Sequence, residues 1–185
     1  MIVRNLGNEN SLFNQFIAEI RDEHIQKDTM RFRRNLERVG EIFAYEISKE
    51  LKFETNDIQT PLGIAQVPVL KESVILSTIL RAGLPLHQGL LNYFDKAENS
   101  FISAYRKYEK DGSFDIKVEY ISSPLTDKKT IIISDPMLAT GASMVYACKA
   151  LMEKGKPNHF HIVTAIASKE GIEHIHIMDF LSELR

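Results

Sequence analysis

The chain has 185 residues, of which 44% are apolar and 26% charged, and we expect residues 1–185 to form a single domain with a sizeable core. The formal net charge of -2 at pH 7 excludes wholesale binding to nucleic acid, which needs many cations to neutralise phosphates, but it allows a small anionic ligand. One cysteine excludes an internal disulfide, and no apolar run reaches the roughly eighteen residues that span a bilayer. We therefore expect a cytoplasmic protein that does not bind a membrane.

The first predicted element is a long amphipathic helix near the N-terminus. Asp28 or Thr29 can cap it. Apolar residues then recur every three or four positions, which gives one buried stripe: Phe32, Leu36, Val39, Phe43, Ile47 and Leu51. Four arginines in the same stretch are more typical of a solvated face than of a phosphate or partner patch, and we assign them no chemistry: Arg31, Arg33, Arg34 and Arg38.

Short apolar runs separated by turn residues follow, and they predict strands at residues 73–80, 101–106, 117–121, 130–134 and 160–167. Runs that are apolar throughout suit a sheet covered on both faces. A helical stretch at about 143–154 lies between two of them, which is a βαβ pattern. The fold class that follows is α/β, with a mostly parallel central sheet flanked by helices. Ligands of such sheets bind beyond the carboxyl ends of the strands.

The stretch "IIISDPMLATGAS" ends a predicted strand at Asp135 and then opens a helix with small residues. Small residues let backbone amides approach a ligand, and a helix N-terminus favours an anion, so the pattern suits a phosphate. Thr140 and Ser143 can add hydroxyl donors, while Asp135 suits sugar hydroxyls or the waters of a metal ion. A structural strand-turn-helix explains the same pattern equally well. Neither a G-x-x-x-x-G-K-[ST] motif nor G-x-G-x-x-G after a strand occurs.

Two arginines follow other predicted strands. Arg81 comes directly after the 73–80 run, where it can fork across a phosphate or diphosphate. Arg106 ends the 101–106 run and precedes "KYEKDGSF", which suits either a mobile flap or an exposed hairpin turn. The convergence of both arginines and the phosphate loop at strand ends favours a ligand site.

These motifs resemble those of a known family. "IIISDPMLATGAS" is similar to the signature with which type I phosphoribosyltransferases bind phosphoribosyl diphosphate (PRPP), and its D-P-M-L-A-T-G form resembles uracil phosphoribosyltransferases. "RFRRNLERVGEIFAYEISKEL" looks like their N-terminal helix, "ILRAGLPLHQGLL" like their diphosphate loop, and "SAYRKY" like the strand before their flap.

The resemblance implies the reaction of uracil with PRPP to give UMP and diphosphate, in pyrimidine salvage. Asp135 and Arg106 would be the catalytic residues, and Mg²⁺ would arrive on PRPP with no metal site of the chain itself. The resemblance also implies a mobile flap after Arg106, a homodimer or larger homo-oligomer, and a non-proline cis peptide between about Leu80 and Gly83. The residues it assigns to PRPP are Arg81, Arg106, Asp135, Pro136, Met137, Leu138, Ala139, Thr140, Gly141, Ala142 and Ser143.

Three features depart from the family pattern. Ala142 replaces a common glycine, which is unfavourable only if that residue needs a positive φ, and Thr78 replaces a proline. The glycine-rich C-terminal segment Y-[IV]-P-G-L-G-D-A-G-D, which reads uracil in the family, is absent, so the uracil-binding residues stay unassigned. A sequence that stops short of the natural end, one altered beyond about His174, or divergence would each account for this. A non-catalytic PRPP or nucleotide sensor, or transfer to another nucleobase, therefore stays open.

The remaining candidates for chemistry are histidines and the cysteine. The pairs His159/His161 and His174/His176 would each place both rings on one face of a strand, although the C-terminal stretch could also be a helix. A zinc site needs further ligands, so we expect surface histidines rather than metal ligands. Cys148 lies on the helix after the phosphate loop, where we expect a small core residue rather than a nucleophile.

Overall fold

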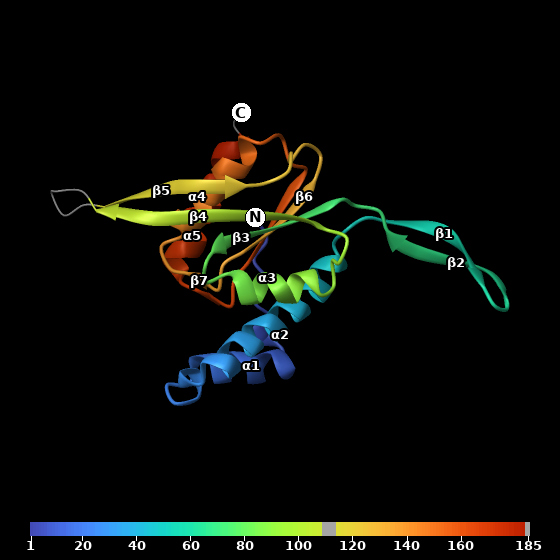
Figure 1. Cartoon of the computed structure of the whole chain (residues 1–185), viewed down its shortest axis with the longest axis horizontal. Coiled ribbons are helices and arrows are strands. Elements are labelled where there is room, and N and C mark those ends of the chain that lie inside the picture. The colour runs from blue at the N-terminus through green and yellow to red at the C-terminus, as the bar shows by residue number, and fades with distance from the viewer. Residues whose placement is uncertain (109–113, 184–185) are drawn as a thin grey trace.

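A computed structural model describes residues 1–108 and 114–183, with the backbone alone for residues 104–108, 114–119 and 177–183. The predicted α/β fold with a mostly parallel central sheet is confirmed (Figure 1). The strand order is β5-β4-β3-β6-β8, in which β3, β4, β6 and β8 run parallel and β5 pairs antiparallel with β4. The strands are β3 (Val74–Leu80), β4 (Glu98–Tyr108), β5 (Phe114–Ser122), β6 (Thr130–Ser134) and β8 (His159–Val163). The carboxyl ends of the four parallel strands therefore share one edge.

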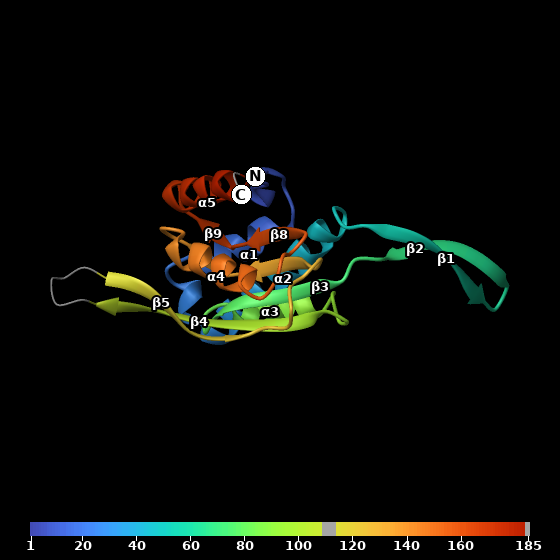
Figure 2. The same cartoon turned by 90° about the horizontal axis from the view of Figure 1, so that it is seen from above.

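The central strands are buried on both faces, as their continuous apolar runs predict. Leu76 and Ile132 enter one core cluster, whereas Ile75 and Ile133 enter the other, because successive side chains of a strand point to opposite faces. The first cluster is completed by α1 (Leu12–Arg21), α2 (Thr29–Ser48) and α3 (Leu84–Leu91), and the second by α4 (Ala142–Met152) and α5 (Lys169–Glu183). Figure 2 shows α4 and α5 together on their side of the sheet.

Two short 3-10 helices, Leu6–Asn8 and Ile25–Lys27, flank α1. No helix in the described part of the chain is long and apolar enough to cross a membrane.

The predicted long helix is α2, and its start is set by a capping side chain. The Asp28 carboxylate accepts hydrogen bonds from the backbone N–H groups of Met30 and Arg31, at 3.1 and 3.0 Å. Leu36 and Val39 are buried, as the apolar stripe predicts. The helix ends at Ser48, however, so the buried Leu51 lies beyond it and not within it.

Arg31, one of the four arginines on α2, links this helix to α1. The Arg31 guanidinium donates to both carboxylate oxygens of Glu19 on α1, at 2.8 and 2.7 Å. Asn35 donates to the same carboxylate at 2.6 Å. The hydrogen bond from Arg31, followed by those from Gln15 and Asn35, lowers the pKa of Glu19 to about 2. This network joins α1 to α2, which is a structural role.

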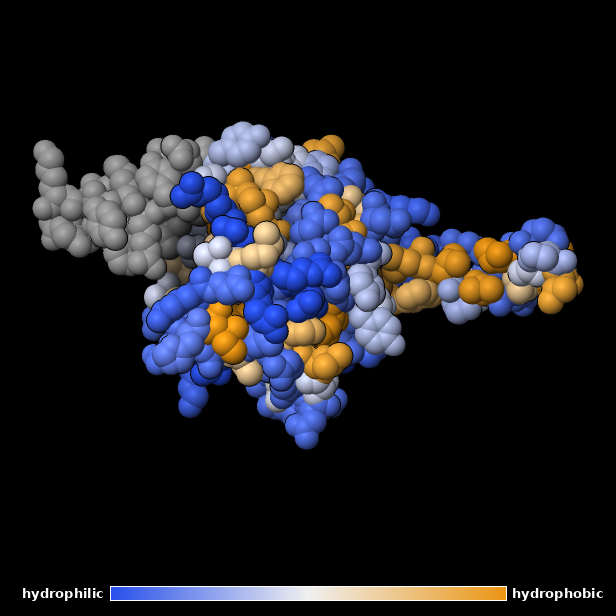
Figure 3. All heavy atoms as spheres, turned by 60° about the horizontal axis from the view of Figure 1, so that its bottom comes forward, coloured by the Kyte–Doolittle hydropathy of each residue, from blue (hydrophilic) through white to orange (hydrophobic). Residues whose placement is uncertain are grey.

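An antiparallel hairpin that the sequence analysis did not predict leaves the body of the molecule as an arm (Figure 1). It consists of β1 (Phe53–Thr60) and β2 (Gly63–Leu70). Exposed apolar side chains lie along it, as Figure 3 shows for the orange part of the arm: Phe53, Ile58, Leu62, Ile64, Val67 and Leu70.

Several predicted strands have different bounds in the structure, and two of these differences bear on the site. The run 160–167 is divided into β8 and the short β9 (Ile166–Ala167), which pairs with β7 (Met137–Leu138) and not with the central sheet. The run 101–106 is part of the longer β4, so Arg106 lies within a strand, opposite Ile116 of β5, and not at its end. The antiparallel pairing of β4 with β5 forms a hairpin. The expected flap includes residues 109–113, which lie outside the described residues.

Helices α2 and α3 cross at a contact between two glycines. A Cβ on Gly89 would lie 1.9 Å from the carbonyl oxygen of Glu37, and one on Gly40 would lie 2.3 Å from that of Leu86. Backbone atoms cannot move aside as the end of a flexible side chain can. The helices that cover one face of the sheet therefore depend on the absence of side chains at this crossing.

We predict that Gly89→Ala lowers the free energy of unfolding by about 1–3 kcal/mol, because the added methyl group separates the two helices. The neighbouring Gln88→Ala, on the exposed side of α3, should change it by less than about 0.5 kcal/mol. Urea denaturation followed by circular dichroism measures both. Equal stability of the two variants would contradict the tight crossing.

Candidate active site

The candidate site is built on the neighbouring strands β3 and β6. Their parallel register places Thr78 opposite Ser134, and the two strands are also joined through these side chains. The Thr78 hydroxyl donates to the Ser134 carbonyl at 3.1 Å, and the Ser134 hydroxyl donates to the Ser77 carbonyl at 3.2 Å. Thr78, which replaces a proline of the family pattern, is thus a buried link between the two strands. The loops that follow them start side by side.

The loop after β3 carries Arg81. The Leu80–Arg81 peptide bond is cis, which confirms the expectation of a non-proline cis bond in this loop. Arg81 and Ala82 are exposed. Gly83 lies against the ends of both strands, since a Cβ there would come within 2.0 Å of Thr78 Oγ1 and 3.1 Å of the Ser134 carbonyl oxygen. The loop is therefore held close to β6 while the arginine faces solvent.

The loop after β6 contains a short strand that was not predicted. Asp135 and Pro136 are half-buried, and Met137–Leu138 form the short strand β7, which pairs with β9. Leu138 is buried in the second core cluster, whereas Met137 is 59% exposed. The small-residue stretch from Asp135 to Ser143 is thus a short strand followed by a turn and the first residues of α4. Its middle is fixed to the core.

Asp135 has an unusual electrostatic environment. Burial raises the pKa of its carboxyl group to about 6, although a hydrogen bond from the Met137 backbone N–H partly opposes the shift. The Asp135 backbone N–H donates to the Val163 carbonyl at 3.2 Å, which ties the residue to β8. An ionised carboxylate at this place is short of hydrogen-bond donors. Ligand hydroxyl groups, or water molecules of a hydrated cation, would supply them.

The N-terminus of α4 is open for an anion. The cap residue Gly141 has φ 77°, in the left-handed region that favours glycine, and it has no side chain to cap the helix. Thr140 Oγ1 accepts one long hydrogen bond, at 3.5 Å, from the Ala142 N–H. The first amides of a helix have no partner within the helix, and the helix dipole adds positive potential at that end. Ala142 is not among the described residues with positive φ, so its methyl group is tolerated. Ser143 follows in the first turn of α4.

Arg106 is placed by its backbone alone. The pairing of β3 with β4 aligns Leu80 with Ser103, so Arg106 lies three residues beyond that level, on the part of β4 that extends past the carboxyl edge. The backbone of Arg106 thus lies at the same edge of the sheet as Arg81 and Asp135.

The structure places the histidines and the cysteine in different surroundings. His159 and His161 share one face of β8, as predicted, with ring centroids 4.6 Å apart. Of the strand and the helix that stayed open for His174 and His176, the structure shows the helix: both lie on α5, where residues two positions apart face different directions. Among the described residues no group of three or more His, Cys, Asp or Glu could hold a metal ion. Cys148 is buried, which confirms it as a core residue, and burial raises the pKa of its thiol to about 12.

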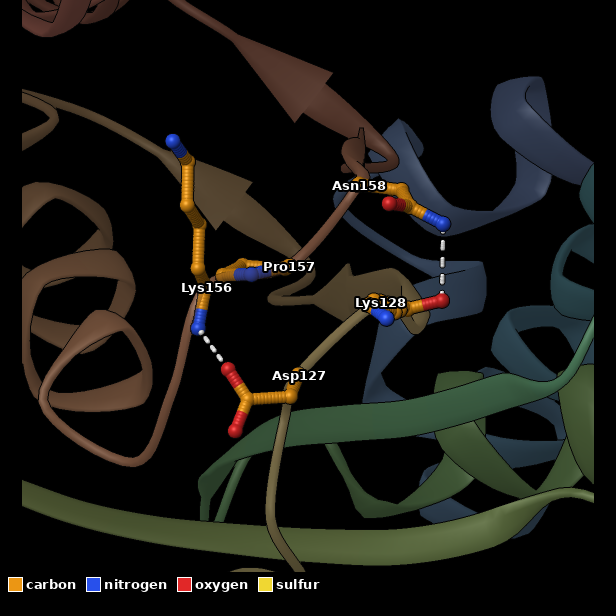
Figure 4. A pocket seen from close by; sticks show the side chains of 5 residues that line it. All are labelled: Asp127, Lys128, Lys156, Pro157 and Asn158. Carbon is orange, nitrogen blue, oxygen red and sulfur yellow. Dashed lines mark hydrogen bonds between the residues drawn. The ribbon is translucent and has the colours of Figure 1, made fainter.

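A surface hollow lies at the opposite edge of the sheet, before the strands β6 and β8 begin. Asp127, Lys128, Lys156, Pro157 and Asn158 line it (Figure 4). The Lys156 backbone N–H donates to Asp127 Oδ1, and Asn158 Nδ2 donates to the Lys128 carbonyl, both at 2.7 Å. These bonds join two connecting loops. None of the predicted site residues lies at this hollow.

Sequence reasoning missed the residues that support the Asp135–Ser143 loop from the side of α5. Ser168, Gly171 and His174, at the start of α5, contact Leu138–Gly141. These contacts are made mostly to backbone atoms, so no motif in the sequence indicates them.

Comparisons with known proteins identify the family of this chain. The model of the family "Uracil phosphoribosyltransferase" matches residues 8–178. The chain belongs to this family. A uracil phosphoribosyltransferase of Porphyromonas gingivalis is 56% identical over 175 residues, which are 95% of this chain and 81% of that protein. One from Methanococcus maripaludis is 36% identical over 152 residues, 80% of this chain and 64% of that protein.

Solved structures support the same fold. A protein from Aquifex aeolicus superposes with a TM-score of 0.83 at 27% identity, covering 96% of this chain and 82% of that one. A purine phosphoribosyltransferase from Pyrococcus horikoshii reaches a TM-score of 0.50 at 15% identity, covering 70% of this chain and 71% of that one. The second likeness shows the type I phosphoribosyltransferase fold alone.

We predict that Asp135→Asn stabilises the ligand-free protein at neutral pH. The folded-state pKa of about 6 exceeds the value of about 3.9 for an unfolded chain, so the folded protein holds this proton more tightly. That contribution to stability is present at low pH and is lost as the pH rises through about 6. Asparagine carries no charge, so the variant should gain about 1–3 kcal/mol at pH 8.

The gain should shrink as the pH is lowered from 8 to 5, which urea denaturation at both values measures. Asp95→Asn, which makes the same substitution at an exposed position, is the control. A destabilised Asp135→Asn at pH 8 would contradict the buried-charge account.

Proposed function

We propose that this member of the family transfers the phosphoribosyl group of PRPP to uracil, giving UMP and diphosphate. The observation that carries the proposal is the adjacency of the Arg81 loop and the Asp135–Ser143 loop, held together by Thr78 and Ser134. Such loops at the carboxyl edge of a parallel sheet are where these folds bind nucleotides and phosphates. Residues 1–185 act as one phosphoribosyltransferase domain in this proposal.

Each part of PRPP has a counterpart at this edge. The open N-terminus of α4, with Gly141–Ser143, receives the 5-phosphate. The Asp135 carboxylate accepts hydrogen bonds from the ribose hydroxyls, which relieves the cost of its buried charge. Arg81, exposed beside it, engages the diphosphate, and Arg106 on the extended β4 approaches from the neighbouring strand.

The reaction itself breaks the bond between C1 of the ribose and the diphosphate oxygen. Uracil N1 forms the new bond to C1 and loses its proton. As positive charge develops on the ribose ring and negative charge on the leaving diphosphate, fixed charges stabilise both. The residues therefore act by position and charge, Asp135 beside the ribose and the two arginines at the diphosphate.

Magnesium fits this arrangement as a companion of the substrate. Among the described residues, Asp135 does not belong to a group of three or more possible metal ligands. A single carboxylate suits a hydrated ion that arrives on the diphosphate. When bound, Mg²⁺ neutralises part of the diphosphate charge.

A cytoplasmic homodimer or larger homo-oligomer completes the proposal. The β1–β2 arm supports it, because a two-stranded hairpin with exposed apolar side chains is only marginally stable alone in water. A second copy of the chain would cover them. The residues that read uracil are not assigned.

The proposed reaction is tested by incubating the chain with PRPP, Mg²⁺ and uracil. We expect diphosphate release that depends on uracil, and UMP in the products by chromatography. Hypoxanthine in place of uracil should give no product. PRPP binding without turnover would instead indicate a sensor, and turnover with hypoxanthine alone would overturn the choice of nucleobase.

Arg81→Ala should lower kcat by about 100-fold or more, because an exposed cation at the leaving group is lost. Its melting temperature should stay within about 1 °C of the parent, since surface positions contribute little to stability. Arg33→Ala, which removes an exposed arginine from α2, is the matched control and should keep full activity. Wild-type turnover of the Arg81 variant would remove this residue from the site.

A further inference from the structure

The first turns of α5 lie directly on the backbone of the phosphate loop. A Cβ on Gly141 would lie 2.9 Å from the Gly171 carbonyl oxygen, and a Cβ on Gly171 would lie 2.7 Å from the Ala139 carbonyl oxygen. The two backbones therefore meet without side chains between them. Ile175, one turn further along α5, is buried in the core cluster beneath α4. The helix is thus anchored to the core while its start contacts the loop.

Three successive carbonyl groups of the loop accept hydrogen bonds from this part of the chain. The Ser168 backbone N–H donates to the Leu138 carbonyl at 2.8 Å, and the Ser168 hydroxyl donates to the Ala139 carbonyl. His174 Nδ1 lies 2.8 Å from the Thr140 carbonyl oxygen. Because a carbonyl oxygen only accepts, His174 must carry its proton on Nδ1.

These bonds also set the direction of the loop amides. In a trans peptide the carbonyl of one residue and the N–H of the next point to opposite sides of the chain. With its carbonyl turned toward His174, Thr140 forces the N–H of Gly141 away from α5. Gly141 is the cap of α4, at the place where the 5-phosphate is proposed to bind. One side chain thus holds the peptide plane that precedes the cap residue.

We propose that His174 is a positioning residue for PRPP: through the Thr140 carbonyl it orients the Gly141 N–H toward the 5-phosphate. The inference rests on the proposed function, because it names a support for that same site. His174 touches no substrate in this account and acts only through the loop. Ser168 fixes the preceding peptide in the same way, but its hydroxyl also accepts a hydrogen bond within the start of α5, from the Gly171 N–H at 2.9 Å. His174 is therefore the cleaner residue to test.

The test compares three variants of the full chain. His174→Ala removes the donor, whereas His174→Asn keeps an N–H donor at about the position of Nδ1. His176→Ala, at an exposed position two residues further along the same helix, is the control. Steady-state kinetics give KM for PRPP and kcat, calorimetry gives the Kd of PRPP, and thermal unfolding reports stability.

We expect His174→Ala to raise KM and Kd for PRPP by about five- to tenfold, the loss from one hydrogen bond, with KM for uracil unchanged. His174→Asn should restore both PRPP constants to within about twofold, and His176→Ala should leave them unchanged. A purely structural role predicts a lower melting temperature in His174→Ala with an unchanged Kd, which would overturn the proposal. Failure of the Asn variant to restore Kd while it folds normally would overturn it as well.

The Kd measurement separates this inference from the proposed reaction. If the parent binds PRPP but releases no diphosphate with uracil, the proposed function fails and the Kd series still decides the role of His174. If the parent does not bind PRPP, both fail. Should His174→Ala not fold, the His174→Asn variant and Gly171→Ala supply the comparison, since a methyl at Gly171 should push α5 off the loop and weaken PRPP binding while the sheet remains intact.

Discussion

The parallel pairing of β3 with β6 is the constraint on which the rest of the site depends. A parallel pair sends both chains out of the sheet at the same edge, and the register of Thr78 opposite Ser134 fixes how far each loop starts from the other. The hydrogen bond from the Thr78 hydroxyl to the Ser134 carbonyl is buried, so slipping the register would leave a polar group unpaired in the core. The positions of Arg81 and Asp135 follow from this pairing.

The two faces of the sheet serve that edge in different ways. On one face, α2 and α3 cross closely at their glycines and enclose an apolar core, which contains none of the residues proposed to bind PRPP. On the other face, α4 and α5 enclose a second core and also contact the loop of residues 135–143. The packing of α4 and α5 therefore fixes the geometry of this loop. The buried carboxylate of Asp135 is the part that works against stability, and a ligand with hydroxyl groups would compensate for it.

The central strands could be predicted because a run such as Ile131, Ile132 and Ile133 places apolar side chains on both faces of a strand, which is typical of a sheet covered on both sides. The sequence did not indicate the β1–β2 arm. The strand residues there are mixed and exposed, and only the turn at Pro61–Gly63 was a usable signal. The break between β8 and β9 was hidden in a continuous apolar run. The support of Thr140 by His174 joins a backbone carbonyl to a side chain 34 positions away, which local patterns do not report.

Hydrogen exchange of the backbone amides, with and without PRPP and Mg²⁺, tests the central claim most directly. If the loops that leave β3 and β6 bind PRPP, protection should rise in peptides that cover residues 79–84 and 135–145. It should not change at the hollow formed by residues 127–128 and 156–158, on the opposite edge of the sheet. Protection at that hollow, with none in the two loops, would contradict the account.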